Sequence, residues 1–197
     1  MGSRSSIGAI IRSKGAEVAL GAAAPSPFAQ PFRIGPVEIP NRVILAPMAG
    51  LTISGYRRHL KAHGVGLVTT EMVSAHGLLH HNIRTGEYLD FREEERPLAV
   101  QLFGDTPEAM AGATEIVLAR SKRPDLIDIN MGCPVRKVVR TGAGSALLAD
   151  PARAVAMAAA VVKVAAQAGV PVTVKLRSGV KAGDGVAAVV DLVDAEE

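Results

Sequence analysis

The fold is decided by the stretch LIDINMGCP at residues 126–134, in which a short apolar run ends at a turn with polar and reactive side chains. The first four residues are apolar at most positions, as expected of a strand buried on both faces of a sheet. Asn130, Gly132 and Pro134 favour turns, so the strand is predicted to end beside them. Cys133 is therefore expected just past the carboxyl end of a buried parallel strand.

Four other short apolar runs rich in β-branched residues flank this stretch and alternate with longer segments of helical pattern. These runs lie at residues 43–46, 67–70, 98–103 and 172–176. Thr106 and Asp150 each place a capping side chain before a proline, which marks the start of a helix. Gly64 and Gly169 suit helix ends. The alternation predicts a series of βα units around a parallel sheet.

A parallel βα series can form a doubly wound sheet or a TIM barrel, and the loop glycines help to distinguish them. The first run is followed by Ala49-Gly50, without the G-x-G-x-x-G pattern that binds a dinucleotide phosphate. Polar or reactive residues follow the ends of several runs, where both folds carry their functional groups. Of these two α/β folds, the missing phosphate loop favours the TIM (β/α)8 barrel, of which only the first five βα units are present.

The chain is predicted to divide into two parts. Residues 1–30 carry several basic residues and serines against one acid, Glu17, which indicates a disordered leader. Residues 31–197 are predicted to form one partial barrel domain, with a final helix over residues 180–197. Because a complete TIM barrel takes eight strands and about 250 residues, we expect this chain to lack the last three strands.

Composition narrows the class of protein. The chain is 48% hydrophobic and has a formal net charge of +3, which permits a polyanionic partner without requiring one. Its most apolar stretch, residues 154–168, is interrupted by Lys163, so no transmembrane helix is expected. Cys133 is the single cysteine of the 197 residues, which excludes an internal disulfide framework. A soluble, cytoplasmic protein is predicted.

Several motifs resemble those of tRNA-dihydrouridine synthases of the bacterial, FMN-dependent type, and they occur in the same order. They are APMAG at residues 46–50, VQLFG at 100–104, NMGCP at 130–134, GAGSALL at 142–148 and VKLR at 174–177. The resemblance covers about residues 32–179 and implies the amino-terminal part of an FMN-binding TIM barrel that carries an added helical domain. Its implied activity is reduction of uridine to 5,6-dihydrouridine in tRNA, with NADPH as the reductant.

The resemblance implies that Cys133 is the proton donor to C5 of the uracil ring, while the flavin delivers a hydride to C6. A thiol is mostly protonated at neutral pH, so it can donate a proton without special tuning. An isolated cysteine is more often a small buried hydrophobe. The position of Cys133 between Gly132 and Pro134, just past a strand end, favours a presented side chain instead.

The resemblance also implies a set of flavin-binding residues at the strand ends. The set consists of Pro47, Met48, Ala49, Gln101 and Lys175. Lys175 would place a positive charge beside the flavin pyrimidine, where it stabilises the anionic reduced ring. Gln101 can both donate to and accept from the flavin edge. A snorkelling lysine and an ordinary strand-end glutamine are the structural alternatives.

A further set is assigned to the tRNA substrate. Its members are Asn130, Arg136, Lys137, Arg140 and Arg177. The amide of Asn130 is expected either to act in the site, by binding the uracil or holding the flavin environment, or to bond its own backbone as a turn residue. The basic residues after Cys133 would meet tRNA phosphates near the target base, although a solvated loop would also be basic. The target uracil must leave its stack to be reduced.

Two charged or polar clusters are interpreted as structural. His76, His80 and His81 lack the H-E-x-x-H pattern and carboxylates at ligand spacing, so a polar loop is predicted and no metal site. The run Glu93-Glu94-Glu95 between two arginines is predicted to be a solvated surface turn.

Two other function classes stay open at this point. The first is another FMN-barrel oxidoreductase that reduces a free pyrimidine, such as a dihydroorotate or dihydropyrimidine dehydrogenase, although the NMGCP loop argues against it. The second is a non-catalytic RNA-binding fragment. The resemblance implies that a flavin-proximal histidine, the phosphate-binding loops and the helical tRNA-binding domain are absent, so the 197-residue chain is expected to be inactive alone.

Overall fold

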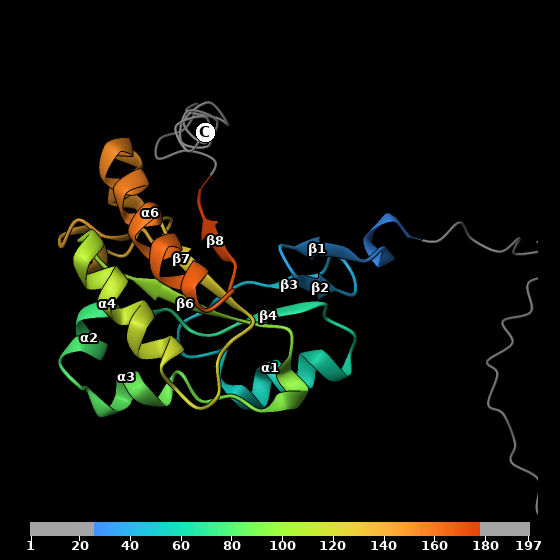
Figure 1. Ribbon diagram of the computed structural model, residues 1–197. Helices are drawn as coiled ribbons and strands as arrows, with labels where there is room; N and C mark the ends of the chain where they lie inside the picture. Colours follow the sequence, from blue (N-terminus) through green and yellow to red (C-terminus); the bar gives the residue numbers. More distant parts are fainter. Residues whose placement is uncertain (1–25, 178–197) are drawn as a thin grey trace, which may run out of the picture.

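The structure is a computed structural model that describes residues 26–177, and it is built on a curved parallel sheet (Figure 1). The strand order is β3-β4-β6-β7-β8, and β5 pairs with the carboxyl end of β6. The strands are β3 (Ile44–Leu45), β4 (Leu67–Thr69), β5 (Val73–Ser74), β6 (Leu98–Phe103), β7 (Leu126–Asn130) and β8 (Val172–Lys175). Sequential strands lie side by side, as in half of a barrel.

Helices follow the strands and cover one side of the sheet (Figure 1). They are α1 (Ser54–Ala62), α2 (Ala75–Leu79), α3 (Ile83–Glu87), α4 (Pro107–Leu118), α5 (Arg136–Val139) and α6 (Pro151–Gln167), with 3-10 turns η1 (Pro27–Ala29), η2 (Glu93–Glu95) and η3 (Gly144–Ala149). Helix α4 packs against both α2 and α6. Met110 and Val117 of α4 and Met157 of α6 are buried in the main core.

The predicted helix boundaries are confirmed. The side chain of Thr106 accepts a hydrogen bond from the Ala109 backbone N–H and begins α4. Asp150 does the same for Arg153 at the start of α6. Gly64 and Gly169 have φ of +87° and +66°, the left-handed conformation that ends a helix at low cost for glycine.

Each of the five predicted apolar runs contains a parallel strand, but burial on both faces holds only for the inner strands. All five residues of β7 are buried, and so are five of the six in β6. Ile44 of β3 is 49% exposed, and β8 is only partly buried. Both strands lie at edges of the described sheet, where a neighbouring strand covers them from one side only.

An antiparallel hairpin, β1 (Phe32–Ile34) and β2 (Val37–Ile39), closes the amino-terminal end of the sheet and was not predicted. Ile39 is fully buried in a cluster with residues at or near the starts of strands β4, β6 and β7, namely Leu67, Ala99 and Leu126. The hairpin therefore occupies the end of the sheet opposite the predicted functional rim.

Two expectations concern the chain ends. Residues 26–30, assigned to the leader, are structured: they include η1, and the Arg42 backbone N–H bonds the Phe28 carbonyl at 2.9 Å. The rest of the predicted leader and the helix over residues 180–197 lie outside the described residues.

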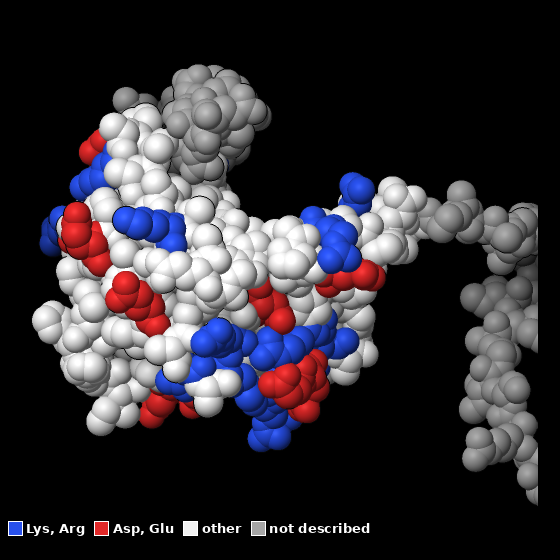
Figure 2. All heavy atoms as spheres, in the orientation of Figure 1, with Lys and Arg blue, Asp and Glu red and all other residues white. Residues whose placement is uncertain are grey.

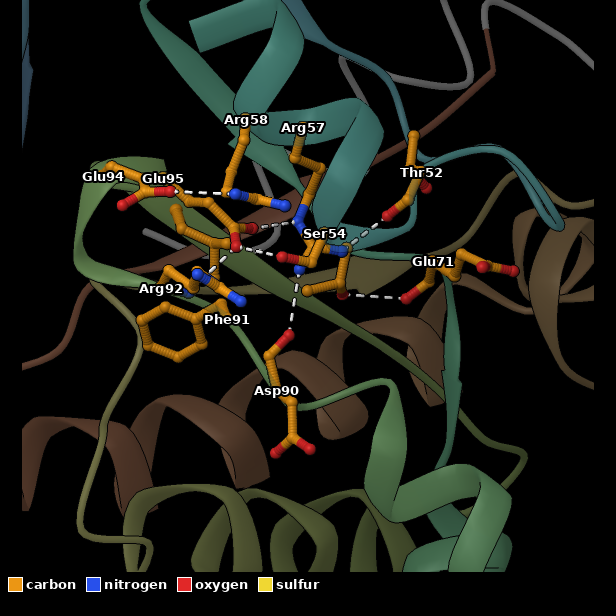
Figure 3. A network of polar contacts seen from close by, with 12 residues as sticks. Thr52, Ser54, Arg57, Arg58, Glu71, Asp90, Phe91, Arg92, Glu94 and Glu95 are labelled. Carbon is orange, nitrogen blue, oxygen red and sulfur yellow. Dashed lines mark hydrogen bonds and ion pairs between the residues drawn. The ribbon is translucent and has the colours of Figure 1, made fainter.

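The prediction of a solvated Glu93-Glu94-Glu95 turn is wrong for Glu95. This side chain is 0% exposed, and its carboxylate pairs with Arg57 Nε at 2.6 Å. Ser54 Oγ and the Arg92 backbone N–H donate to the same carboxylate, at 2.5 and 2.9 Å (Figure 3). Glu95 points inward from η2 onto α1, because a 3-10 turn directs successive side chains to different sides.

The buried Arg57–Glu95 pair connects two loops to α1 by hydrogen bonds. Arg57 also donates to the carbonyl oxygens of Thr52 at 2.5 Å and Asp90 at 3.0 Å (Figure 3). Around it, acidic and basic side chains lie next to each other on the surface over α1 (Figure 2). Exposed pairs such as Arg58–Glu94 form the outer part of this region.

We predict that Glu95→Ala lowers the free energy of unfolding by about 3–5 kcal/mol, because it leaves the Arg57 charge buried without its partner. Glu94→Ala is the matched control, since it removes an exposed pair worth about 0–1 kcal/mol. Urea denaturation of both variants measures the difference. Equal destabilisation by the two substitutions would contradict the buried-pair interpretation.

Candidate active site

Most of the side chains predicted for cofactor and catalysis meet at the carboxyl ends of the strands. A cavity of about 290 Å³ opens there, and we call it the Cys133 cavity. Its lining includes six residues predicted from the sequence: Pro47, Ala49, Gln101, Asn130, Cys133 and Lys175. These residues come from the ends of four strand segments, which is the arrangement expected of a barrel active site.

Five predicted residues lie outside this lining. They are Met48, Arg136, Lys137, Arg140 and Arg177. The Met48 side chain packs against the main core, and its backbone N–H and C=O bond Thr52 within the loop. Arg177 lies beside Gly132, where an added Cβ would come within 3.1 Å of Arg177 Cγ. Its side chain therefore borders the cysteine turn from the end of β8.

The three other basic residues lie on or next to α5. Arg136 and Lys137 belong to this helix, and Arg140 is its C-cap. Lys137 lines a second cavity of about 520 Å³. That cavity shares Ala49, Met72 and Val135 with the Cys133 cavity, so the two are neighbours along the rim.

A row of buried and partly buried polar side chains crosses the inner face of β6, β7 and β8. The pairing register places Gln101 opposite Asp128, and Asp128 opposite Thr173. Gln101 Nε2 donates to Asp128 Oδ2 at 2.6 Å, and Thr173 Oγ1 donates to Asp128 Oδ1 at 2.7 Å. Asn130 Nδ2 donates to Gln101 Oε1 at 2.8 Å. We call these four residues the inner-face row.

The inner-face row ends at the cysteine turn. Asn130 Oδ1 accepts the backbone N–H of Gly132 at 3.2 Å and that of Cys133 at 2.9 Å. Asn130 therefore bonds its own turn, one of the two roles expected for it, and it also bonds Gln101. Because Asn130 bonds both Gln101 and the turn, it fixes the position of the Cys133 backbone relative to the sheet.

Gly144 packs against the other side of the cysteine turn. Its φ is +61°, and an added Cβ would lie 2.6 Å from the Cys133 carbonyl oxygen. The next residue, Ser145, donates its backbone N–H to the same oxygen at 3.0 Å. The start of η3 thus packs against the Cys133 backbone and bonds its carbonyl oxygen.

Asp128 and Thr173 were missed by the sequence interpretation, although a carboxylate within an apolar strand is itself a signal. Burial raises the pKa of the Asp128 carboxyl. The hydrogen bonds from Thr173 and Gln101, and then the charge of Lys175, lower this pKa and so oppose the effect of burial. The Lys175 ammonium is thus electrostatically linked to the inner-face row.

The loop after β3 is held in place by Glu71, another residue that the sequence interpretation did not single out. Its Oε2 accepts the Gly50 backbone N–H at 2.6 Å, and Gly50 has φ of +75°. Thr52 closes the loop through its bonds to Met48. Pro47 and Ala49 are consequently the loop residues that face the Cys133 cavity.

Histidines gather outside the Cys133 cavity. His76 Nε2 bonds Asp105 Oδ1 at 2.6 Å beside the second cavity. Within residues 26–177, no group of three or more His, Cys, Asp or Glu side chains is placed to hold a metal ion. No helix in this part of the chain is long and apolar enough to span a membrane.

The parallel βα sheet, with its polar residues at the carboxyl rim, defines a TIM-barrel-like protein. A solved structure of histamine dehydrogenase from Rhizobium sp. 4-9 matches this fold with a TM-score of 0.59 and 12% identity, over 86% of this chain and 35% of that one. The family model described as dihydrouridine synthase matches residues 44–197. The chain belongs to the dihydrouridine synthase family.

Two of the curated relatives are named as tRNA-dihydrouridine synthases. The chain is 41% identical over 147 residues to tRNA-dihydrouridine synthase B of Pseudomonas aeruginosa, which covers 75% of this chain and 43% of that protein. It is 39% identical over 158 residues to a probable tRNA-dihydrouridine synthase of Synechocystis, covering 79% and 42%. The chain therefore spans less than half the length of these relatives.

We predict that Gly144→Ala lowers the free energy of unfolding by at least about 2 kcal/mol, because a left-handed non-glycine residue costs about 1–2 kcal/mol and the new Cβ also meets the Cys133 carbonyl. Gly86→Ala is the control: Gly86 lies within α3 with nothing near its Cβ position, so alanine should not destabilise the protein. Urea denaturation distinguishes them. A tolerated Gly144→Ala would contradict the close packing of this turn.

Proposed function

We propose that this protein reduces uridine to 5,6-dihydrouridine in tRNA, with FMN as bound cofactor and NADPH as reductant. Membership of the dihydrouridine synthase family supports the reaction class. The observation that carries the proposal is the position of Cys133, which lines a rim cavity together with Gln101, Asn130 and Lys175. We propose this activity for the complete protein, because the chain spans less than half the length of its curated relatives.

Cys133 is the proposed proton donor. When bound, FMN would supply the hydride that reduces C6 of the uracil ring, and NADPH would replenish it. The Cys133 S–H bond breaks as a new C–H bond forms at C5, so hydride and proton together saturate the C5=C6 bond. The resulting thiolate regains a proton from water, because Cys133 is only partly buried.

The residues of the Cys133 cavity fit a flavin ring. Gln101 keeps one amide N–H and one oxygen lone pair beyond its bonds to Asp128 and Asn130, and Lys175 offers a cation suited to an anionic reduced ring. Both line the cavity beside Pro47 and Ala49. The Met48 backbone is engaged by Thr52, so of the three loop residues we assign the flavin contact to Pro47 and Ala49 first.

The tRNA contacts are proposed for the basic residues around the rim. Arg136, Lys137 and Arg140 lie on or beside α5, which begins three residues after Cys133, and Arg177 borders the same turn. Positive charge there suits phosphates next to a flipped uridine. Asn130 lines the cavity and can reach the uracil only through its remaining amide N–H, since Oδ1 bonds the turn. We propose a cytoplasmic location, which suits a tRNA substrate.

We predict that Cys133→Ala, in the protein expressed from its complete gene, lowers dihydrouridine formation by about 10²–10⁴-fold, the usual contribution of a general acid. Flavin content should stay unchanged, because the flavin-contacting residues remain. Mass spectrometry of digested tRNA measures the product, and visible absorbance measures the flavin. Glu94→Ala, on an exposed pair outside the lining of the Cys133 cavity, is the control.

The outcomes separate the function classes. Loss of product with flavin retained supports a proton-donating Cys133. A Cys133→Ala variant that keeps the parent rate contradicts that role. Flavin reoxidation by free uracil or orotate, with no response to tRNA, would instead indicate a free-pyrimidine oxidoreductase.

A further inference from the structure

The hydrogen bonds that link the cysteine turn to Asp128 along the inner-face row all run in one direction, which is determined by the groups at the two ends of this chain of bonds. At one end, Asp128 is 8% exposed and its ionised carboxylate can only accept hydrogen bonds. At the other end, the backbone N–H groups of Gly132 and Cys133 can only donate. Gln101 and Asn130 lie between them, and each side-chain amide has one donating and one accepting side.

The ends permit only one orientation of the two amides. Because Asp128 accepts from Gln101 Nε2, Gln101 must turn its Oε1 toward Asn130. Asn130 then presents its Nδ2 to Gln101 and its Oδ1 to the cysteine turn. Gln101 is fully buried, so water does not offer an alternative partner. Inverting either amide would set like groups against each other at each end.

We propose that Asp128 is a positioning residue, which orients the amides of Gln101 and Asn130 and thereby holds the Cys133 turn in its reactive place. Its influence on the reaction rests on the function proposed for Cys133. Asp128 itself does not line the Cys133 cavity, so it acts through its two amide neighbours. Thr173 supports it from β8 by donating to the second carboxylate oxygen.

The row is sensitive to protonation of Asp128. A protonated Asp128 carboxyl can donate a hydrogen bond to Gln101 Oε1. The Gln101 amide is then no longer restricted to the orientation in which its Nε2 faces Asp128. Burial raises the pKa of this group, and the Thr173 and Gln101 hydrogen bonds and the Lys175 charge lower it. A third cavity, of about 370 Å³, lies beside the inner-face row, and Lys175, on β8, is the other charged residue among those that line it with Asp128. The turn is therefore held above the Asp128 pKa and released as the pH falls through it.

Asp128→Asn tests the proposal, because asparagine keeps the shape of the side chain but can either donate or accept. We expect backbone hydrogen exchange at Gly132 and Cys133 to accelerate about tenfold, as for the loss of one ordinary hydrogen bond. Exchange is followed by mass spectrometry in the complete protein and corrected for the intrinsic effect of pH. Dihydrouridine formation should fall about tenfold in kcat, with the KM for tRNA unchanged.

Thr173→Val gives an independent test that keeps the charge. It removes a hydrogen bond to the ionised carboxylate, so it raises the Asp128 pKa, and the acid release of the turn should move to higher pH. In Asp128→Asn this pH dependence should disappear. Asp125→Asn is the control, since Asp125 is likewise a hydrogen-bonded aspartate, which accepts the Leu98 backbone N–H and pairs with Arg96, but at the opposite end of the strands.

The results distinguish this proposal from the proposed function. Exchange at the cysteine turn within about twofold of the parent in Asp128→Asn, together with an unmoved acid transition in Thr173→Val, would overturn the positioning role. Altered exchange in both variants supports it even if Cys133→Ala retains full dihydrouridine formation. That second result would contradict only the role of Cys133 as proton donor.

Discussion

The pairing register of β6, β7 and β8 is the constraint on which the site depends. It sets Gln101, Asp128 and Thr173 side by side, and two residues further along it sets Asn130 beside Lys175. Because side chains alternate between the faces of a strand, a shift of one residue would send this set to the opposite face. The hydrophobic residues that alternate with Asp128 and Asn130 along β7, Ile127 and Ile129, pack into the core and so stabilise this register.

Two buried polar systems hold the rim from different directions. The inner-face row reaches the cysteine turn through Asn130, while the Arg57–Glu95 pair fixes the loop after β3 through the Thr52 carbonyl. Buried polar groups destabilise a protein unless they are satisfied, so each system constrains the backbone that satisfies it. Cys133 and Ala49 consequently face one cavity, although they lie far apart in the sequence.

Most of the strand order and several site residues were predictable. Apolar runs located the parallel strands, and capping residues such as Thr106 located the helix starts, because both depend on local patterns. Six residues chosen from these runs or from the turns that follow them line the Cys133 cavity. The run of three glutamates was misjudged at Glu95, since exposure at one position of a short turn depends on what packs over it.

The sequence by itself determined the family, the parallel βα series and the residues that stand at strand ends, because these are properties of order and spacing along the chain. Only the tertiary structure decided which side chains contact each other. Asp128 and Thr173 are 45 residues apart, and nothing local indicates that they bond. Their meeting depends on strand pairing across the sheet, and so does the role of Asn130 in joining the inner-face row to Cys133.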